Sequence, residues 1–585
     1  MTTRHLPPPF AGEGRGGGAA RVPSAIPTQP SPARGGGLAR RTTQVLVVGA
    51  GPVGLTLAMD LALRGVRVTV AEIRHRGQAP PAKSTPVAAR SMEIFRRLGL
   101  AAALREAGLP PDYPNDVAYR ITATGEELAR IPIPCRRDRF AATGGPDTWW
   151  PTAEPPHRIN QLYLEPILFA HAEAMPGITI LDRTRVIDFT QDARGVVARA
   201  EALDDGAPME VACAWLVGCD GGSSAIRRQI GARFEGDAVV SRVQSTLIRA
   251  PALLGLFKAR PAWGTFSLNP RRAGNMYAID GRELWLIHNY LRPEEADFDS
   301  VDRDACIRAI LGVGPDFEYA VVSREDWHGR RLVADRLRDR RVFICGDAAH
   351  IWVPMAGYGM NAGIADAENL AWMLAAVQGG WAPEGLLSAH EAERLPITEQ
   401  VSRYAMNHEL ALAAQRRAVP ADIEAPGRAG EAVRARVGRD AYELNVNQYC
   451  CGGLNFGYFY ENSPIIAPDA EAAPPYSMYH FTPSTVPGCR LPFLWLQDGR
   501  PLYDALGPWF TLLRRDRAVD ASPLLAAARV RGVPMALLDL DADEGPSLYR
   551  HALVLARPDR HVAWRGDAVP ADPLALIDLI RGPRA

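Results

Sequence analysis

Several patterns that mark other classes of protein are missing from this sequence. No run of 18 consecutive apolar residues occurs, which argues against a membrane-spanning helix. The 66 basic and 66 acidic side chains balance, so there is no excess positive charge for binding nucleic acid. Lysine is nearly absent, since Lys83 and Lys258 are the only two, and we expect any phosphate group to be bound by arginine instead.

The eight cysteines lack the spacing of a redox or metal site. None forms a CxxC pair. Cys450 and Cys451 are adjacent, which suits ordinary disulfide geometry poorly, and Cys213, Cys219 and Cys345 fall in or beside apolar runs typical of core thiols. We therefore expect reduced cysteines, a cytoplasmic location and no bound metal.

The length and the first residues suggest how the chain is divided. A chain of 585 residues is too long for one core, and about two to four domains are expected. Residues 1–42 are rich in glycine, proline and arginine and show no apolar periodicity, which is typical of a disordered tail. This tail also lacks the apolar core of a signal peptide.

The first informative stretch is QVLVVGAGPVGLTLAMDLALRGVRVTVAE, from Gln44 to Glu72. Its pattern predicts a buried strand at Val45–Val48 and a GxGxxG turn at Gly49, Gly51 and Gly54. A helix at Val53–Arg64 and a second strand at Arg67–Ala71 are predicted to follow. Glu72 follows where an acidic side chain can accept hydrogen bonds from a ribose. We interpret the stretch as a dinucleotide site for NAD or FAD, with a tight turn that binds no ligand as the alternative.

A second stretch, Arg341 to Gln378, predicts a strand at Arg341–Cys345, a Gly-Asp turn and then a helix. Apolar residues recur at steps of three and four from Ile364 onward. The segment Gly357–Asn361 feeds the helix N-terminus, where free N–H groups can hold an anion or a developing negative charge. Such an arrangement suits an electron-accepting ring.

A third stretch, WLVGCDGGSSAIRRQIG from Trp215 to Gly231, predicts a strand that ends at Asp220 and a helix that follows. Ser224 can cap that helix, and Arg227 can meet a phosphate. An ordinary helix cap with a surface arginine is the alternative.

Together the three stretches resemble the FAD-dependent aromatic hydroxylase family, of the para-hydroxybenzoate hydroxylase type. The second stretch matches the family pattern GDAAH...P...G.GMN..I.DA.NL.W, which favours FAD over NAD. Ala356, Tyr358 and Met373 depart from it, standing where glycine, glutamine and lysine are common. These departures concern the wall of the pocket.

The resemblance implies roles for individual residues. Asp347 would bind the ribitol side of the flavin, Pro354 would lie beside the isoalloxazine, and Asp220 would lie where the flavin and the nicotinamide nucleotide meet. The implied cofactor-binding residues are Gly49, Gly51, Pro52, Val53, Gly54, Glu72, Ile73, Arg74, Arg90, Gln161, Asp220, Asp347, Gly359, Met360 and Asn361, and those at the reacting centre are Pro354, Gly359, Met360 and Asn361. Arg90 and Gln161 lie in helices predicted at Ala89–Leu100 and Arg158–Leu168, where a role at a helix start or in solvent is the alternative.

The resemblance also implies an α/β fold with three domains and a helical linker. A Rossmann-like FAD-binding domain would comprise residues 43–115, 155–235 and 325–400, and a mostly antiparallel β-sheet substrate domain would be inserted as residues 116–154 and 236–324. A helical linker (401–473) and a thioredoxin-like C-terminal domain (474–585) would follow; without a CxxC pair we expect the latter to serve packing or subunit contact. Tyr277, Trp285, His288 and Tyr358 are candidates to contact the substrate, and a core or solvent role is the alternative.

The implied activity is that of a single-component, FAD- and NAD(P)H-dependent monooxygenase. It would hydroxylate a phenolic, polycyclic aromatic compound through a flavin C4a-hydroperoxide, with O2 and NADPH (or NADH) as transient co-substrates and with no nucleic acid or membrane partner. No charged cradle for a small carboxylate is visible between Ser241 and Tyr290, which favours a weakly polar substrate. His350 is interpreted as structural. Baeyer-Villiger oxygenation of a polycyclic ketone, a flavin-binding sensor or scaffold without turnover, and a homodimer remain open.

Overall fold

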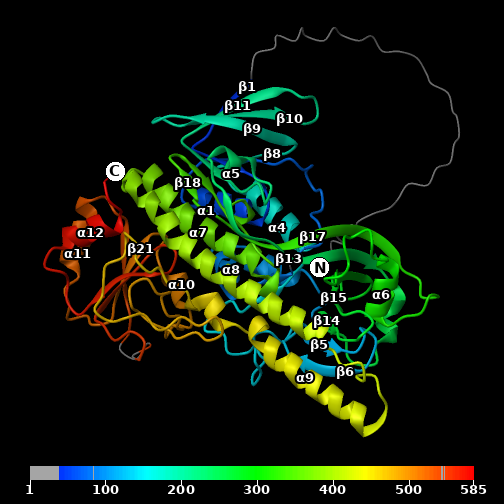
Figure 1. Ribbon diagram of the computed structural model, residues 1–585. Coiled ribbons are helices and arrows are strands. Elements are labelled where there is room, and N and C mark those ends of the chain that lie inside the picture. Colours follow the sequence, from blue (N-terminus) through cyan, green and yellow to red (C-terminus); the bar gives the residue numbers. More distant parts are fainter. Residues whose placement is uncertain (1–38, 84, 542–544, 546, 585) are drawn as a thin grey trace, which may run out of the picture. The chain divides into compact units, whose positions relative to one another are not determined.

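The computed structural model describes residues 39–83, 85–541, 545 and 547–584 (Figure 1). Most of the tail predicted over residues 1–42 lies outside these ranges. Its last 4 residues, Ala39–Thr42, form strand β1, which pairs in parallel with β11 (Pro208–Cys213). The predicted end of the tail is therefore wrong by those residues. No helix within the described ranges is long and apolar enough to span a membrane.

A six-stranded sheet lies at the centre of the nucleotide-binding part. Its order is β18-β19-β12-β2-β3-β8, and all neighbouring pairs are parallel except β18 with β19. The strands are β2 (Val45–Val48), β3 (Val68–Ala71), β8 (Ile178–Leu181), β12 (Trp215–Gly218), β18 (Arg338–Asp339) and β19 (Val342–Ile344). Strand β2 is buried at every residue, as a strand covered on both faces must be, and the strand predicted there is confirmed.

Helices cover one face of this sheet, and a four-stranded sheet covers the other. Val45 and Val47 belong to the core on the helical side, whereas Leu46 and Val48 belong to the core on the other side. The helices are α1 (Pro52–Leu63), α2 (Ala89–Arg97), α3 (Ala101–Glu106), α4 (Gln161–Ala174) and α7 (Tyr358–Gln378). The covering sheet has the order β1-β11-β10-β9, with β9 (Thr184–Gln191) and β10 (Val196–Ala202), and the short helix α5 (Ala225–Gln229) adjoins it.

An eight-stranded sheet is inserted into this part. Its order is β20-β17-β13-β16-β15-β14-β5-β6, and only β5 and β14 pair in parallel. The strands are β5 (Val117–Arg120), β6 (Glu127–Ile131), β13 (Phe234–Arg249), β14 (Gly264–Ser267), β15 (Gly274–Ala278), β16 (Leu284–Tyr290), β17 (Ala320–Ala334) and β20 (His350–Ile351). Helix α6 (Arg303–Leu311) packs on one of its faces. A short pair, β4 (Pro86–Val87) with β7 (His157–Arg158), stands apart from these sheets.

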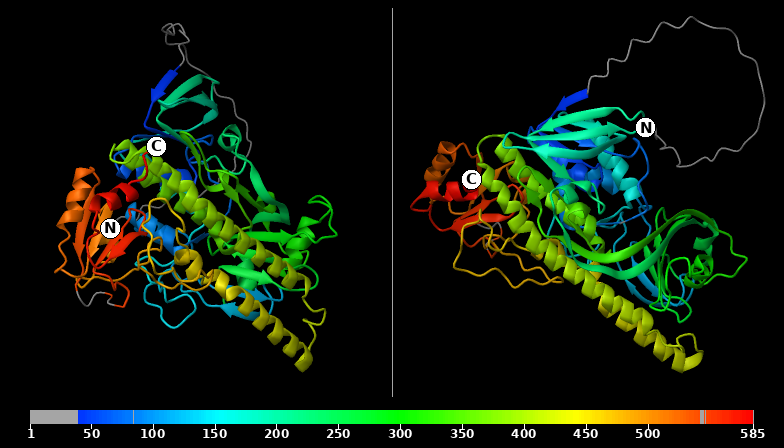
Figure 2. Two further views of the ribbon diagram at one scale, coloured as in Figure 1. Left: turned by 60° about the vertical axis from the view of Figure 1, so that its left-hand side comes forward. Right: turned by 45° about the horizontal axis from the view of Figure 1, so that its top comes forward.

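Two long helices lead to the C-terminal part, α8 (Ser388–Arg417) and α9 (Gly427–Tyr449). The last sheet has the order β22-β21-β23-β24. It belongs to the orange and red C-terminal part of the chain in Figure 2. Its elements are α10 (Leu502–Ala505), β21 (Phe510–Arg514), α11 (Ser522–Val530), β22 (Met535–Asp539), β23 (Leu553–Ala556), β24 (Val562–Gly566) and α12 (Pro573–Ile580). Strands β21 and β22 are parallel and joined through α11, whereas β23 and β24 form an antiparallel pair followed by α12.

The C-terminal sheet shares its apolar core with α7. Trp372 of α7 meets Phe510 of β21 edge to face, with ring centroids 5.9 Å apart. Both belong to one continuous cluster that also contains β2 and α1. The C-terminal part is therefore packed as a continuation of the nucleotide-binding core.

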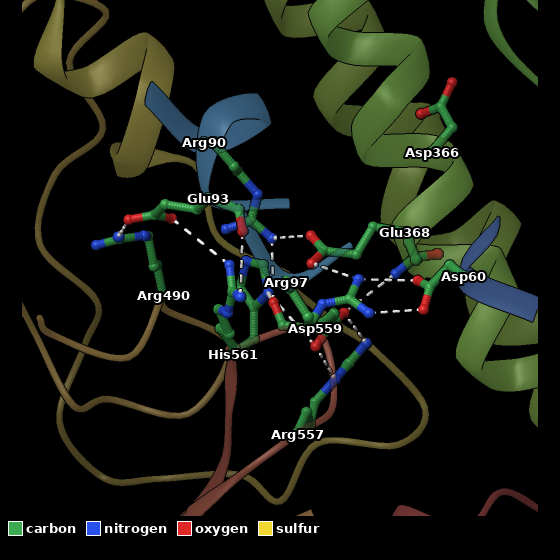
Figure 3. A network of polar contacts seen from close by, with 12 residues as sticks. Asp60, Arg90, Glu93, Arg97, Asp366, Glu368, Arg490, Arg557, Asp559 and His561 are labelled. Carbon is green, nitrogen blue, oxygen red and sulfur yellow. Dashed lines mark hydrogen bonds and ion pairs between the residues drawn. The ribbon is translucent and has the colours of Figure 1, made fainter. Parts of the chain in front are cut away.

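Buried charges link the same two parts (Figure 3). Arg557, which follows β23, donates to Glu393 of α8 at 2.5 and 2.8 Å and to Asp559 at 2.8 Å. Arg490 donates to Glu93 of α2 at 2.5 Å. All five residues are at most 3% exposed. Removing one partner would leave the opposite charge buried without compensation, which destabilises a fold far more than losing a surface ion pair does.

We expect Arg557→Gln to lower the free energy of unfolding by about 3–5 kcal/mol, because two buried carboxylates lose their shared cation. Urea unfolding of the purified protein measures this. The matched control is Arg500→Gln, since Arg500 pairs with Asp498 on the surface, where the two side chains are 60% and 49% exposed. Equal unfolding midpoints for the two variants would contradict the role assigned to the buried contacts.

Candidate functional site

The three glycines of the first turn have different surroundings. A side chain at Gly49 would place its Cβ 2.4 Å from the carbonyl oxygen of Cys219, and one at Gly54 would place it 2.0 Å from that of Gly49. A Cβ at Gly51 would meet no atom within 4 Å. Two glycines therefore allow close packing of the turn, and Gly51 leaves open space in front of the N-terminus of α1.

The N-terminus of α1 is ready to meet an anion. Its cap residue is Gly51, Pro52 occupies the first turn, and no side chain caps the helix. The free N–H groups and the positive end of the helix dipole thus face the open space at Gly51. A pyrophosphate fits such a cradle.

Glu72 is held at the end of β3 by its own neighbours. Its carboxylate accepts the N–H of Ala50 at 2.7 Å and the N–H of Arg74 at 2.9 Å. Burial alone would raise the pKa of Glu72, but hydrogen bonds from Arg74 and Ala50 outweigh it and lower the pKa. Arg74 also donates to Glu165 at 2.9 Å. Ile73, which lies between Glu72 and Arg74 in the sequence, is 56% exposed. An ionised carboxylate therefore lies beside the turn, where we predict a ribose contact.

Asp347 lies in a short 3-10 turn, Gly346–Ala348, and is exposed although its neighbours are buried. Within the described ranges its carboxylate has no hydrogen-bond or ion-pair partner. The turn packs against α1, since a Cβ at Gly346 would lie 3.0 Å from a methyl group of Val53. The predicted contacts at Val53 and Asp347 are thus brought to neighbouring positions.

Helix α7 begins at Tyr358, so the first turn contains Gly359 and Met360, which the sequence placed in a loop. Its cap, Gly357, has φ +62°, and no side chain caps the helix. The Asn361 amide accepts the N–H of Ala88 at 2.8 Å and donates to the carbonyl oxygens of Pro86 and Gly357 at 3.0 and 2.7 Å. Asn361 therefore fixes the helix start, while the first N–H groups lack partners within the helix.

Gln161 meets this helix start from α4. Its side-chain amide donates to the sulfur of Met360 at 3.3 Å, although the two residues are 199 positions apart. Pro354, just before the helix, is exposed. The structure therefore gathers Gln161, Met360 and Asn361, while their contact with a flavin stays a prediction.

Asp220 caps α5 together with Ser224. The Asp220 carboxylate accepts the N–H groups of Ala225 and Ile226 at 2.8 and 3.3 Å, and Ser224 accepts that of Arg227 at 2.8 Å. The second carboxylate oxygen of Asp220 is buried and has no partner in the described chain. The predicted cap at Ser224 is confirmed, and one oxygen of Asp220 is left without a hydrogen-bond partner in the described chain.

Arg227 connects two of the motifs, and the sequence patterns did not predict this connection. Arg227 is buried and donates to the carbonyl oxygens of Gly222 and Ala348 at 3.0 and 3.3 Å. It also lies over the ring of Phe234 at 3.7 Å. We expected Arg227 to meet a phosphate, but the structure assigns it to holding the Asp220 and Asp347 turns together.

Arg90 lies in the buried network of Figure 3. It donates to Glu368 of α7 at 3.2 Å and to the carbonyl oxygen of Asp559 at 3.1 Å, and it is 4% exposed. Its guanidinium group is engaged within the protein. These hydrogen bonds of Arg90 join parts of the protein to each other. Its contact with a cofactor stays a prediction.

His350 is structural, as interpreted from the sequence. Its Nε2 lies 2.6 Å from the carboxylate of Asp366, which Arg394 also contacts at 2.8 Å. Burial would raise the pKa of Asp366, but His350 and Arg394 outweigh it and lower the pKa. The imidazole is thus held by a buried hydrogen bond to Asp366.

The inserted sheet divides the substrate candidates between its faces. Trp285 is fully buried on the α6 face and donates to the carbonyl oxygen of Ala250 at 3.2 Å, so a substrate contact by Trp285 is ruled out. Tyr277 and His288 lie on the other face, 5.3 Å apart between ring centroids. Burial lowers the pKa of His288 to about 4, so this imidazole is neutral.

The sheet face that carries Tyr277 is aromatic and lies next to the start of α4. The ring of Tyr277 lies 6.2 Å from Phe266, which lies 5.1 Å from Tyr119. Leu286, the register partner of Tyr277, packs with Leu162 in the first turn of α4. The same turn carries Gln161, so the aromatic face and the start of α7 adjoin one another.

Comparison with known proteins agrees with this geometry. Residues 42–405 match the family described as FAD binding domain. The FAD-dependent monooxygenase apdD of Emericella nidulans is 30% identical over 559 residues, covering 90% of this chain and 88% of its own. The RebC structure with bound 7-carboxy-K252c has a TM-score of 0.84 at 33% identity and covers 93% of this chain and 100% of its own. Aklavinone-11 hydroxylase with FAD and aklavinone has a TM-score of 0.75 at 28% identity, with coverages of 92% and 98%.

These matches define an enzyme of the flavin monooxygenase class. The chain belongs to the FAD-dependent aromatic hydroxylase family, as the three motifs implied. The open space at Gly51, the uncapped N-terminus of α1 and the unpaired Asp347 all fit the FAD that this family binds.

Gly51→Val should abolish FAD binding while leaving the apoprotein folded, because its Cβ would meet no protein atom within 4 Å whereas the side chain would fill the cradle. Flavin absorbance per chain measures the first effect, and thermal unfolding of the apoprotein measures the second. Gly54→Val is the contrast, since its side chain would clash with the turn itself. Full flavin content in Gly51→Val would refute the assigned cradle.

Proposed function

We propose that this chain is a FAD- and NAD(P)H-dependent hydroxylase of a phenolic, polycyclic aromatic compound. The observation that supports it most is that an uncapped helix start, at Tyr358 to Asn361, adjoins an aromatic sheet face. FAD that is bound and reduced by NAD(P)H would activate O2, so that one oxygen atom of O2 goes to the substrate and the other leaves as water. The protein has to bind, orient and shield the reactants.

The chain's own residues have distinct tasks in this proposal. Asp347 would hold the ribitol side of FAD, and the cradle at Gly51 would hold the pyrophosphate. The N–H groups of Gly359 and Met360 would stabilise negative charge that develops on the adjacent ring, as donors fixed before the reaction do most effectively. Asp220, with one free oxygen, would face the nicotinamide nucleotide.

The aromatic face supports a flat substrate. Tyr277 is half-buried and is the ring of this face that a substrate could meet, whereas Phe266 and Tyr119 beside it are 5% and 0% exposed and pack with α9, and Trp263 lies 5.1 Å from Tyr277. Large rings bury much apolar area and stack with defined geometry. With Pro354 beside the flavin, this face would cover the opposite side of the substrate.

We also propose that the C-terminal part is thioredoxin-like and serves packing. Its strand order and its βαβ unit followed by an antiparallel pair and a helix support the likeness. Cys489 is the only cysteine after residue 473, so no dithiol can form within it. Burial also raises the pKa of the Cys489 thiol to about 11, which disfavours the reactive thiolate.

The experiment is NADPH consumption by the FAD-loaded protein across a panel of phenols and polycyclic aromatics. We expect at least one compound to accelerate NADPH oxidation and to gain an aryl hydroxyl group that carries label from isotopic O2, as seen by NMR. Labelled ring oxygen in a lactone would favour Baeyer-Villiger oxygenation instead. Flavin binding with no compound that accelerates oxidation would favour a sensor or scaffold.

A further inference from the structure

A second feature lies close to the start of α7. A pocket of about 40 Å³ is enclosed by the segment Pro86–Ala88, by β7, by the C-terminal end of α9 and by Tyr358. A water needs roughly 10–15 Å³ of such space, so the pocket has room for a group about the size of a carboxylate and not for a ring system. The sequence patterns did not predict this pocket.

Most of the charges around this pocket cancel. Arg139 pairs with Asp147 through its Nη1 and also donates to the Asp147 carbonyl oxygen at 2.7 Å. Trp150 donates to the same carboxylate at 2.7 Å. Burial, helped by Arg105, lowers the pKa of His157 to about 3, so this imidazole is neutral. The acidic residue on the pocket is therefore already satisfied.

Arg158 is a lining cation that makes no ion pair in the described chain; Asp147, which already pairs with Arg139, acts on it electrostatically without contact. It is 8% exposed, and none of its nitrogens has a hydrogen-bond acceptor or an ion-pair partner among the described residues. Its guanidinium group lies 3.8 Å from the ring centre of Trp263 and 5.7 Å from that of Tyr449. Stacking on aromatic rings satisfies the flat faces of the group but not its N–H donors.

A buried cation in this state is costly unless an anion joins it. The planar guanidinium fork is matched by a carboxylate, which it can bind through two parallel hydrogen bonds. Tyr358 provides a second polar side chain, because it also lines the pocket and no hydrogen bond of its hydroxyl occurs within the described residues. Two polar side chains therefore line the same small space.

The surroundings also indicate what the anion is attached to. Tyr449 and Trp150 line the pocket, and Trp263 behind Arg158 lies 5.1 Å from Tyr277 on the aromatic sheet face. Tyr358 is followed directly by Gly359, at the predicted flavin edge. A ring joined to an anion in the pocket would thus lie against Tyr449 and Trp150.

We propose that this pocket binds the carboxylate of an aromatic acid through Arg158 and Tyr358. Calling that acid the substrate rests on the proposed hydroxylase function, whereas its binding does not. The inference changes the expected substrate class from weakly polar phenols to phenols that carry a carboxyl group. The sequence argument considered only Ser241 to Tyr290, and Arg158 lies outside that range.

Calorimetric titration with 2-naphthoate and with 2-naphthamide, which has the same rings without the charge, tests this on the FAD-loaded protein. We expect the acid to bind about tenfold or more tightly than the amide, as a charge-assisted bidentate contact should provide. Arg158→Met should remove that difference, Arg158→Lys should keep part of it, and Tyr358→Phe should reduce it. Arg137→Met is the matched control, because Arg137 is 63% exposed and does not line the pocket.

Equal affinities of acid and amide for the unaltered protein would overturn the proposal. So would an unchanged acid affinity in Arg158→Met, or competition by inorganic phosphate as strong as that by 2-naphthoate. If Arg158→Met fails to fold, Tyr358→Phe and Arg158→Lys still test the proposal. An unchanged preference for the acid over the amide in both variants would overturn it. The titration measures binding and needs no turnover. An absence of NADPH oxidation would therefore refute the proposed function without changing the outcome of this binding test.

Discussion

The structure depends on helix α7 being buried along almost its whole length. Of its 21 residues, 18 are buried, between α1, α8 and the C-terminal sheet. A helix so enclosed must satisfy every charge it carries, because an unpaired buried charge is prohibitively costly. Asp366 is met by His350 and Arg394, and Glu368 by arginines of α2. These pairs fix where α2 and α8 lie and bring the C-terminal segment against the nucleotide-binding core.

The same burial places the helix start at the functional site. Gly357 adopts a left-handed conformation, no side chain caps the helix, and the Tyr358 N–H donates to the carbonyl oxygen of Met355. The N–H groups that a ligand could meet are therefore those that follow, at Gly359 and Met360. Rigidity comes instead from the Asn361 amide, which bridges the helix to Pro86 and Ala88. The segment held in this way also forms a wall of the pocket at Arg158. The aromatic face and the pocket at Arg158 thus both adjoin the start of α7.

Features set by local patterns could be predicted from the sequence, whereas those that need distant partners could not. The buried strand β2, the glycine turn and the Ser224 cap follow from short-range rules. The face on which Trp285 lies depends on strand register, and Arg90 depends on partners 278 and 469 positions away. The unpaired state of Arg158 is likewise a property of the folded chain, since nothing in its neighbouring residues indicates that an acceptor is missing.

The measurement that tests the account most directly is a crystal structure of the FAD complex. The account predicts the pyrophosphate at Gly51, the ribitol at Asp347, and the pyrimidine edge within hydrogen-bond distance of the N–H groups of Gly359 and Met360. An isoalloxazine ring with no contact to the start of α7, or a pyrophosphate bound away from Gly51, would contradict it.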